Sequence, residues 1–317
     1  MTNVQPLIII AGPTASGKSA LAVELAKRLP AEIISADSIQ VYRHMDIGSA
    51  KITPEEMQGI PHHLIDVLDP DEEFNVVVFQ QMAKEAYLQI RSRHKIPMVV
   101  GGTGFYIQAL LYDIDFESED ENTEIRERLE RQADTEGIEA LYALLREKDP
   151  NACLQIHPHN RKRVIRALEF YEKNDYPISE HNEKMRQKES PYNYLYFALE
   201  DARKDIYQRI EQRVDQMMAQ GLVDEVENLL ASGYDRHLVS MQGLGYKEIC
   251  AYLAGELSLA EAIDLIKKET RHFAKRQITW LKREPDVIRL PRPKDANETE
   301  ALCQKMLQMI KDKGITP

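Results

Sequence analysis

The sequence has none of the features that mark membrane-spanning or disulfide-stabilised proteins. Its longest apolar runs fall far short of the roughly 20 residues that a transmembrane helix requires, and residues 1–6 contain no basic stretch followed by an apolar region that would form a targeting signal. Its three cysteines, Cys153, Cys250 and Cys303, lie far apart with no paired spacing, which argues against a disulfide framework and against a four-ligand zinc site. We therefore expect a cytoplasmic protein with no membrane partner.

The chain also has fewer positively charged than negatively charged residues. The chain has 41 lysines and arginines against 52 aspartates and glutamates, which gives a formal net charge of -11. This balance argues against a nucleic-acid partner, because the affinity of such proteins comes from neutralising phosphates. An acidic average can nevertheless conceal a basic stripe, so the local positions of the cations decide the question.

The amino-terminal third alternates between strand-like and helix-like patterns. A short run rich in isoleucine leads directly into a glycine-containing turn, and a helix follows in which Leu21, Leu25 and Leu29 have helical spacing. The expected elements, in order, are a strand at 7–11, a helix at 19–29, strands at 32–36 and 64–67, a helix after Asn75, and a strand at 96–100. This alternation predicts an α/β protein with a parallel sheet flanked by helices.

The pattern changes after Asp113. An acidic stretch follows, through Glu117, Glu119, Asp120 and Glu121, and the sequence from there to about Ser190 is helical in pattern. Strand patterns return at 192–199 and 287–290, with a helical stretch from about Asp205 between them. We therefore predict a catalytic core of residues 1–115 and 191–317, with a helical carboxyl-terminal part, and an inserted all-helical domain of residues 116–190.

Residues 12–19 match the phosphate-loop pattern G-x-x-x-x-G-K-[ST], between a predicted strand and a predicted helix. The eight residues are Gly12, Pro13, Thr14, Ala15, Ser16, Gly17, Lys18 and Ser19. The backbone N–H groups of such a loop form an anion cradle, Lys18 supplies a positive charge, and the Ser19 hydroxyl can ligate Mg²⁺. We therefore predict a P-loop NTPase-like fold that binds a diphosphate or a triphosphate.

The phosphate loop does not specify what carries the phosphates. Most chains with this loop bind ATP or another nucleotide, and they usually place a magnesium-binding carboxylate at the end of a core strand. Here the strand at 96–100 ends in Gly101, Gly102, Thr103 and Gly104. Asp37 instead follows the strand at 32–36, at the edge where α/β sheets place their ligands. Its carboxylate can bind magnesium through water, act as a general base, or simply form a turn.

Further motifs are spread over nearly the whole chain. Besides the phosphate loop they are Asp-Ser-Ile-Gln-Val-Tyr at 37–42, Ile-Pro-His-His-Leu-Ile-Asp at 60–66, Gly-Gly-Thr-Gly-Phe-Tyr at 101–106, Gln-Gly-Leu-Gly-Tyr-Lys at 242–247, and Ala-Lys-Arg-Gln-Ile-Thr-Trp-Leu-Lys-Arg at 274–283. With these motifs the chain resembles the bacterial tRNA dimethylallyltransferases, also called tRNA isopentenyltransferases or the IPP transferase family. The resemblance implies transfer of a dimethylallyl group from dimethylallyl diphosphate to the exocyclic amine of adenosine 37 in tRNA, 3′ of the anticodon, giving N6-dimethylallyladenosine and diphosphate.

The resemblance also implies roles for individual residues. The phosphate loop would hold the diphosphate of the donor, with Mg²⁺ bridging it and Arg209 in contact with it. Asp37 would take the proton from the attacking amine, with Thr103 beside it at the reaction centre. The residues that approach the acceptor base would be Asp37, Ser38, Ile39 and Gln40. We further expect the enzyme to act as a monomer.

Two basic helices answer the objection raised by the net charge. In the insert, Arg161, Lys162, Arg163 and Arg166 open a helix whose apolar side contains Val164, Leu168 and Tyr171. The resemblance implies that the insert contacts the tRNA anticodon stem-loop through Arg126 and through Lys162, Arg163, Val164, Ile165 and Arg166. It also implies a tRNA contact from Thr103 of the core. The second helix begins at Ser258 with a capping box to Glu261, and it carries Lys268, Arg271, Lys275 and Lys282 on one face. The alternative interpretation is a solvated basic face with no partner.

Three other functions stay open at the level of sequence. The same chemistry could act on free adenine nucleotides, as in the plant-type isopentenyltransferases that the chain also resembles. A P-loop kinase would instead turn over a nucleotide, and a nucleic-acid-binding module would bind tRNA without catalysis. The helical insert and the basic carboxyl-terminal helix favour tRNA as the acceptor.

Overall fold

The computed structural model describes residues 5–116, 123–186 and 188–317, and it divides into two compact units. The first unit comprises Met1–Leu111 with Pro191–Pro317, and the second comprises Tyr112–Ser190. The acidic stretch through Glu117, Glu119, Asp120 and Glu121 lies outside the described residues. Within the described ranges, no helix has the length and apolar character needed to cross a membrane.

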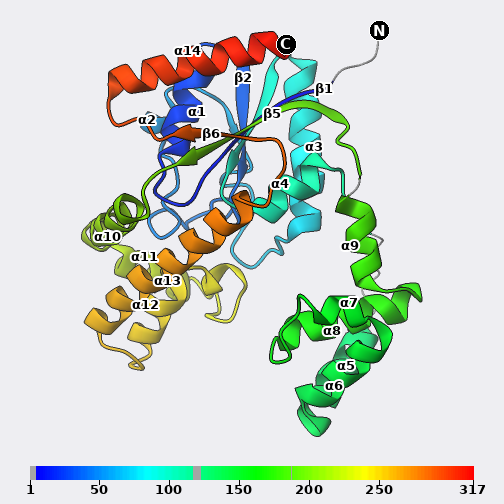
Figure 1. The fold of residues 1–317 in the computed structure, drawn as a ribbon. Coiled ribbons are helices and arrows are strands. Elements are labelled where there is room, and N and C mark those ends of the chain that lie inside the picture. The colour runs from blue at the N-terminus through cyan, green and yellow to red at the C-terminus, as the bar shows by residue number, and fades with distance from the viewer. Residues whose placement is uncertain (1–4, 117–122, 187) are drawn as a thin grey trace. The chain divides into compact units, whose positions relative to one another are not determined.

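The first unit is built on a six-stranded sheet in which neighbouring strands run parallel (Figure 1). The strands are β1 (Gln5–Ala11), β2 (Ala31–Ala36), β3 (His62–His63), β4 (Ile96–Gly101), β5 (Tyr192–Glu200) and β6 (Val287–Pro291). Their order across the sheet is β3-β2-β4-β1-β5-β6, so the chain returns from the helical unit to lie beside β1. The predicted α/β class with a parallel sheet is confirmed.

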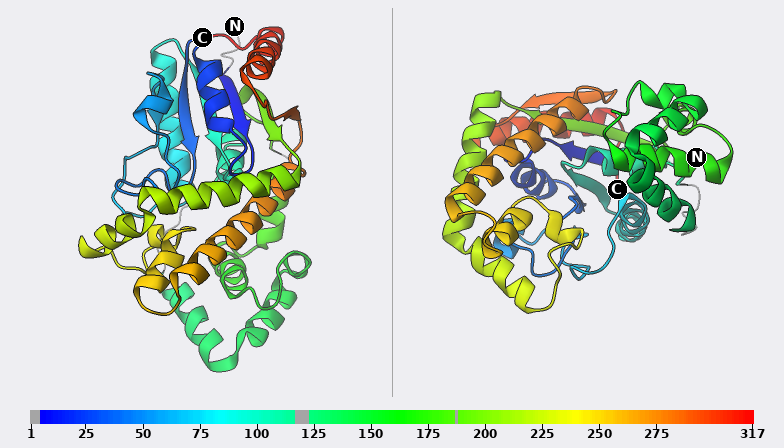
Figure 2. Two further views of the ribbon diagram at one scale, coloured as in Figure 1. Left: turned by 90° about the vertical axis from the view of Figure 1, so that its left-hand side faces the viewer. Right: turned by 90° about the horizontal axis from the view of Figure 1, so that it is seen from below.

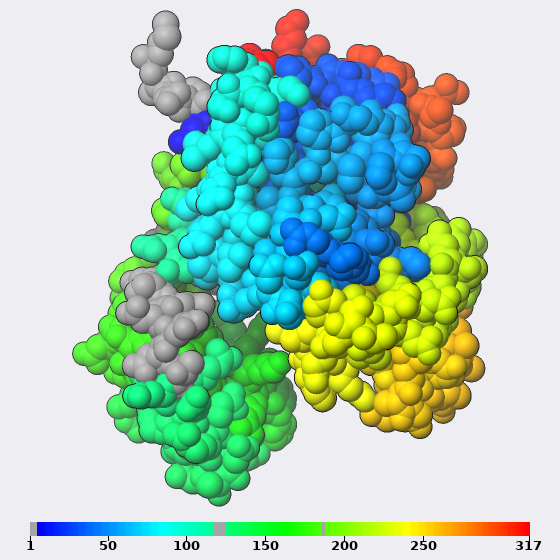
Figure 3. Space-filling model, turned by 180° about the vertical axis from the view of Figure 1, so that it is seen from behind, coloured from blue at the N-terminus to red at the C-terminus, as the bar shows by residue number. Residues whose placement is uncertain are grey.

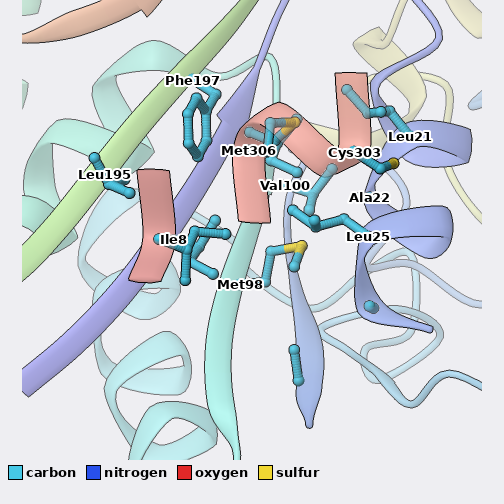
Figure 4. Packing of buried hydrophobic residues seen from close by; sticks show 14 of the residues in the cluster. Ile8, Leu21, Ala22, Leu25, Met98, Val100, Leu195, Phe197, Cys303 and Met306 are labelled. Carbon is cyan, nitrogen blue, oxygen red and sulfur yellow. The ribbon is translucent and has the colours of Figure 1, made fainter. Parts of the chain in front are cut away.

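Helices cover both faces of this sheet (Figure 2). On one face lie α1 (Lys18–Ala26) and α14 (Ala296–Asp312), and Figure 4 shows Ile8, Met98 and Phe197 from three strands meeting Leu25 and Met306 from these helices. On the other face lie α3 (Val76–Ser92) and α4 (Gly104–Leu111). Because the sheet is covered on both sides, β2 and β4 are buried at every position, which explains their continuous apolar runs in the sequence.

The remaining helices of the first unit include two long ones beyond the carboxyl ends of the strands. Figures 1 and 2 show α10 (Arg203–Gln220) and α13 (Leu259–Leu281) crossing there. Both reach the strand ends directly, because Arg209 of α10 donates a hydrogen bond to the Ala15 carbonyl and Gln277 of α13 donates one to the Gly102 carbonyl. The shorter helices are α2 (Pro54–Met57), α11 (Leu222–Ala231), the 3-10 helix η1 (Ser240–Gln242) and α12 (Tyr246–Leu253).

The second unit is helical throughout its regular elements, as the sequence pattern predicts. Its helices are α5 (Thr123–Glu136), α6 (Ile138–Lys148), α7 (Pro150–Cys153), α8 (Arg161–Asn174) and α9 (Ile178–Arg186). Leu129, Leu145 and Leu168 from three of these helices share one buried cluster. The buried carboxylate of Asp149 caps α7 and accepts hydrogen bonds from the backbone N–H and hydroxyl of Ser179. The unit thus has an apolar core of its own.

Two predicted helix starts are confirmed, whereas the strand predicted at 64–67 is not. Asn75 caps α3 by accepting from the N–H groups of Val77 and Val78, and Ser258 forms the predicted capping box with Glu261. The strand expected at 64–67 is wrong, since β3 occupies His62–His63 instead. Leu64 (φ 62°) and Asp66 (φ 54°) adopt the left-handed conformation, which an extended strand does not permit.

Candidate active site

The phosphate loop joins β1 to α1 at the carboxyl edge of the sheet. Ala15 (φ 61°) and Gly17 (φ 82°) both adopt left-handed backbone conformations, so the chain turns tightly before the helix. α1 begins at Lys18, and the N–H groups of a first helical turn have no carbonyl of their own helix to bind. Together with the positive end of the helix dipole, these N–H groups form the anion cradle that the sequence predicts.

Three cations surround this loop. Burial lowers the pKa of the half-buried Lys18 to about 8, an effect that the charge of Asp37 opposes. Arg209 donates from Nε to the Ala15 carbonyl at 2.8 Å and from Nη2 to the Asp201 carboxylate at 2.7 Å. Arg213 lies one turn further along α10, and burial lowers the pKa of its guanidinium. Cations held partly out of water and close to one another are stabilised by a bound anion.

Two more polar groups beside the loop are buried, and neither has a hydrogen-bond partner in the part of the chain that the structure describes. They are the hydroxyl of Ser16 and the Nε of Arg292. Arg292 follows β6, its backbone N–H donates to the Glu200 carbonyl, and its guanidinium lies beside Gly17. Buried donors without acceptors are unfavourable unless a ligand or an ordered water binds them. The loop therefore has an excess of donors over acceptors.

Asp37 lies directly after β2, at the same edge of the sheet. Its Oδ1 accepts from the backbone N–H of Ile39 at 2.9 Å and of Gln40 at 3.3 Å, so the residue does form the turn considered from the sequence. Its Oδ2 accepts no hydrogen bond from any described residue. The charge of Asp37 acts on the pKa of Lys18 and of Arg213, which places the carboxylate within electrostatic range of the anion cradle. Oδ1 of Asp37 thus fixes a turn, and Oδ2 remains available to accept a hydrogen bond or a proton.

The end of β4 brings Thr103 next to Asp37. β2 and β4 are neighbours with Ala36 opposite Gly101, and the Thr103 N–H donates to the Ala36 carbonyl at 3.3 Å. Two glycines make room for α13 at this point. A side chain on Gly102 would overlap the Gln277 amide, and one on Gly104 would overlap the Trp280 indole. The strand therefore ends in a loop against which a helix packs, and no carboxylate stands there.

Ser38, Ile39 and Gln40 begin a loop that is fixed by contacts of its own. Gln40 donates from Nε2 to the carbonyls of Ser49 at 3.3 Å and Ala50 at 3.1 Å. Its amide nitrogen is therefore engaged within the loop.

Glu225 of α11 anchors the far end of the same loop. Its carboxylate accepts the N–H groups of Asp46, Ile47 and Gly48 at 2.7–3.0 Å and the hydroxyl of Tyr246 at 2.7 Å. Burial raises the pKa of Tyr246 well above its usual value, so its hydroxyl remains a donor. Figure 3 shows the blue loop segment packed against the yellow segment that contains η1 and α12.

α13 has two different long faces. Ala274 and Gln277 are buried toward the loops of the sheet, whereas Lys268 and Lys275 are exposed. Arg271, on the same predicted stripe, is paired with Glu211 at 2.8 Å, so part of its charge is already neutralised. A surface hollow of about 370 Å³ on this helix is lined by His272, Lys275, Arg276, Thr279, Trp280 and Arg283. The stripe is basic, as the sequence predicts, but its residues differ in exposure and in ion pairing.

The helical unit carries the other predicted tRNA contacts. Arg126, Lys162 and Arg163 are exposed, and Arg166 lies 3.6 Å from the Glu169 carboxylate. Val164 and Ile165 correct the prediction, because both side chains are fully buried in the core of the unit and neither is available for surface contact. The physical reason is helical spacing, which turns these two residues inward while their neighbours face solvent.

The described residues contain no group of three or more His, Cys, Asp or Glu side chains that could enclose a metal ion. The side-chain oxygens in or close to the phosphate loop include the hydroxyls of Thr14, Ser16 and Ser19 and the carboxylate of Asp37. Mg²⁺ fits such a sparse set, because it prefers oxygen ligands and keeps several waters and substrate phosphate oxygens in its shell.

Comparison with known proteins agrees with this geometry. Residues 40–284 match the family profile described as IPP transferase, and residues 5–69 match the profile described as isopentenyl transferase. The chain belongs to the IPP transferase family. Membership predicted from the motifs is thereby confirmed, and with it the class of enzyme, a transferase.

Relatives in this family are similar over almost the full length. The chain is 56% identical to the tRNA dimethylallyltransferase of Lachnoclostridium phytofermentans, over 98% of this chain and 99% of that protein. The crystal structure of the tRNA isopentenylpyrophosphate transferase from Bacillus halodurans matches with a TM-score of 0.73 at 40% identity, over 98% of both chains. A structure of a eukaryotic dimethylallyltransferase acting on tRNA matches with a TM-score of 0.81 at 28% identity, over 98% of this chain and 79% of that one.

Sequence reasoning missed several residues that the structure places at the site. Arg213 follows Arg209 by four positions, a spacing that puts both on one face of a helix and that could have revealed it. Gln277 interrupts the apolar face of α13, four residues after Phe273, and this interruption was also a signal. Asp201 and Arg292 had no comparable signal, because only the folded chain brings them to the phosphate loop.

Proposed function

We propose that this IPP transferase moves a dimethylallyl group from dimethylallyl diphosphate to the exocyclic amine of adenosine 37 in tRNA. The observation that carries the proposal is the combination at the carboxyl edge of the sheet. A phosphate cradle with Lys18, Arg209 and Arg213 lies beside the carboxylate of Asp37, and β4 ends without the acidic residue that nucleotide hydrolases use. The names of the relatives support the same donor and acceptor.

The reaction forms one bond and breaks another. The amine nitrogen attacks the allylic carbon, the carbon–oxygen bond to the diphosphate breaks, and diphosphate leaves with the electron pair. Lys18, Arg209 and Arg213 stabilise the negative charge that develops on the leaving group. The free Oδ2 of Asp37 accepts the proton from the amine, while Oδ1 keeps the residue in its turn. Thr103 lies beside it and contacts the reacting base.

Magnesium completes the donor site in this proposal. It would be held by the Ser19 hydroxyl, by diphosphate oxygens, and through water by Asp37, a set that needs no dedicated cage of carboxylates. When bound, it supplies charge neutralisation for the departing diphosphate.

The acceptor base must leave its stack in the anticodon loop to reach Asp37, as in other enzymes that modify a base. The base would approach Asp37 past the two loops described above, which contain Ser38, Ile39, Gln40 and Thr103. Phosphate contacts to the anticodon stem-loop come from exposed cations and from two half-buried arginines that already face carboxylates. The exposed cations are Arg126, Lys162, Arg163, Lys268 and Lys275, and the two arginines are Arg166 and Arg271. We propose that the enzyme acts as a monomer in the cytoplasm, where tRNA is available.

The decisive experiment is mass analysis of nucleosides after incubation of the purified chain with dimethylallyl diphosphate, Mg²⁺ and unmodified tRNA. We expect one dimethylallyladenosine per tRNA molecule, located 3′ of the anticodon, and no product after chelation of the metal with EDTA. Parallel incubations replace tRNA with AMP, and the donor with ATP.

These parallel incubations separate the competing functions. Prenylated AMP with unmodified tRNA would assign the chain to free nucleotides, and phosphate transfer from ATP would make it a kinase. Binding of tRNA with no consumption of the donor would leave only a binding module.

A further inference from the structure

Gln277 connects the two loops that carry the donor cradle and the reaction centre. Its Oε1 accepts the backbone N–H of Thr14 in the phosphate loop at 2.8 Å. Its Nε2 donates to the carbonyl of Gly102 at 3.0 Å, one residue before Thr103. A single side chain from α13 therefore bridges the ends of β1 and β4, which are adjacent strands.

Only one orientation of the Gln277 amide satisfies both of its hydrogen bonds. The amide oxygen meets a donor and the amide nitrogen meets an acceptor, so a flipped amide would lose both hydrogen bonds. The side chain is 7% exposed, and it lies on the buried face of α13 beside Ala274. Burial of a polar side chain is tolerated when its hydrogen bonds are made, and such groups fix one arrangement of their surroundings.

The residues that Gln277 contacts are those whose spacing matters for the reaction. Thr14 lies within the loop that takes the diphosphate, and the Thr103 N–H in turn binds the carbonyl of Ala36, next to Asp37. We propose that Gln277 is a positioning residue, which holds the donor cradle and the Thr103 loop at the distance required for attack on the allylic carbon. This inference rests on the proposed function.

The close packing at Gly102 also supports a positioning role for Gln277. A Cβ at position 102 would overlap Nε2 of Gln277 and would also come close to the Gly12 carbonyl in the phosphate loop. The two loops are therefore packed against each other with Gln277 between them, and there is no room for a larger linker. Small changes in spacing of about 1 Å at a reaction centre can slow an enzyme by about 10²-fold.

The test uses Gln277→Met, which retains the volume of the side chain and removes both hydrogen bonds. We expect kcat for prenyl transfer to fall by about 10-fold to 10²-fold through lost positioning, while the Kd for tRNA stays at the wild-type value. Gln80→Met is the matched control, because Gln80 is also buried, 6% exposed, and donates to the backbone carbonyl of Ala109. The control should lose stability to a similar degree and keep its kcat.

A second variant, Gln277→Glu, adds a readout that a merely structural role would not move. A protonated carboxyl group donates one hydrogen bond and accepts one, as the amide does, whereas the ionised form can only accept. The ratio of variant to wild-type rate should therefore rise as the pH is lowered from about 8 to about 6, since protonation of a buried carboxyl restores the link.

The outcomes distinguish this inference from the proposed function. If wild-type protein prenylates tRNA but Gln277→Met retains full kcat, the positioning role is wrong and the proposed function stands. An equal loss of kcat in Gln80→Met would also overturn it, by showing that loss of buried amides in general slows the enzyme. A flat pH ratio for Gln277→Glu would contradict the hydrogen-bonded link itself. If the wild-type protein prenylates nothing, the proposed function has failed.

Discussion

The donor site and the outer face of α13 both present cations for phosphates, but they are built in opposite ways. Around the phosphate loop, the side chains of Lys18, Arg209 and Arg213 are half-buried, and Arg209 is fixed by two hydrogen bonds. On the outer face of α13, Lys268 and Lys275 are exposed and form no ion pair with any described residue. The first region is therefore partly shielded from water and held by hydrogen bonds, and the second is solvated.

This difference separates two uses of positive charge. Cations held out of water interact strongly with a ligand but destabilise the empty protein, so they suit a small donor that must be placed accurately. Exposed cations contribute little to the geometry, and each phosphate that they neutralise adds a salt-dependent increment of affinity. Specific variants should therefore affect rate, stability and salt dependence separately.

The largest effect should come from the carboxylate at the rim of the donor site. Asp37→Ala should slow single-turnover transfer by about 10²-fold to 10⁴-fold, the usual effect of losing a general base. The affinity for tRNA should change little, because this residue neutralises no phosphate. Rapid-quench measurement of product at saturating substrates checks the rate, and filter binding checks the affinity. An unchanged single-turnover rate would refute the role of Asp37 as the base.

Removal of the half-buried Lys18 ammonium should have the next largest effect, and it tests whether this charge favours donor binding at the expense of folding stability. Lys18→Met should lower kcat/KM for dimethylallyl diphosphate by about 10²-fold to 10³-fold, because one stabilising charge on the leaving group is lost. The same change should raise Tm at neutral pH. Burial lowers the pKa of Lys18 from 10.5 to about 8, so the charged form is disfavoured in the folded protein.

The pH dependence of that stability has a definite sign. Between about pH 8 and 10.5 the unfolded chain binds more protons at Lys18 than the folded chain, so wild-type stability rises relative to the variant as pH increases. The gap in Tm should therefore be widest below pH 8 and should shrink above it. Calorimetry on both proteins without donor checks this. A lower Tm for Lys18→Met at pH 7 would contradict the idea that the donor site is destabilising when empty.

The same contrast explains how much the sequence could predict. The phosphate loop, Asp37 and the strand around 96–100 are local patterns, so residues near one another in the chain reveal them, and the fold class and family follow. Arg209 was assigned through the family resemblance, and its contact with the Ala15 carbonyl is compatible with that role. Gln277 lies in the motif at 274–283 and interrupts an apolar face, but these signals do not reveal its role. Its partners, Thr14 and Gly102, are distant in sequence and bind it through backbone atoms that carry no residue identity.

The predicted basic faces were limited in a different way. Periodicity identified the cations of α8 and α13, but it could not show that Arg271 is paired with Glu211, a residue of another helix. It did indicate that Val164 faces inward, and the structure adds Ile165 to the same core. The prediction of a strand at 64–67 was wrong because Leu64 and Asp66 adopt left-handed conformations, which the apolar content of the segment does not reveal.

A smaller effect is expected on the exposed face of α13. Lys275→Ala should weaken tRNA binding a few-fold and reduce the slope of log Kd against log salt by about 0.7 to 0.9, the value for one phosphate contact. Arg271→Ala is the paired comparison, and its slope should change less because Glu211 already neutralises part of its charge. Filter binding across a salt series measures both. If neither slope changes, the outer face of α13 does not lie on the tRNA.

The smallest effect on activity should arise from Glu32, a buried charge at the opposite end of the sheet. Its carboxylate is 2% exposed and lies near the start of β2, where it is held by Arg93, Lys95 and His63. Burial alone would raise the pKa of Glu32, but hydrogen bonds from Arg93, His63 and Lys95 outweigh it and lower the pKa to about 2. Unlike Lys18, this charge is fully paired, so it should stabilise the protein.

Glu32→Gln should therefore lower Tm at pH 7 and leave kcat unchanged, the reverse of Lys18→Met. The stabilisation is complete above the ordinary pKa of 4.5 and is lost as pH falls toward 2, so the gap in Tm should close over that range. Glu256→Gln is the control, because Glu256 forms an exposed pair with Arg236 whose loss should change Tm very little. Equal losses of Tm in the two variants would mean that burial does not determine how much a paired charge stabilises this protein. The contrast between Glu32 and Lys18 would then lose its basis.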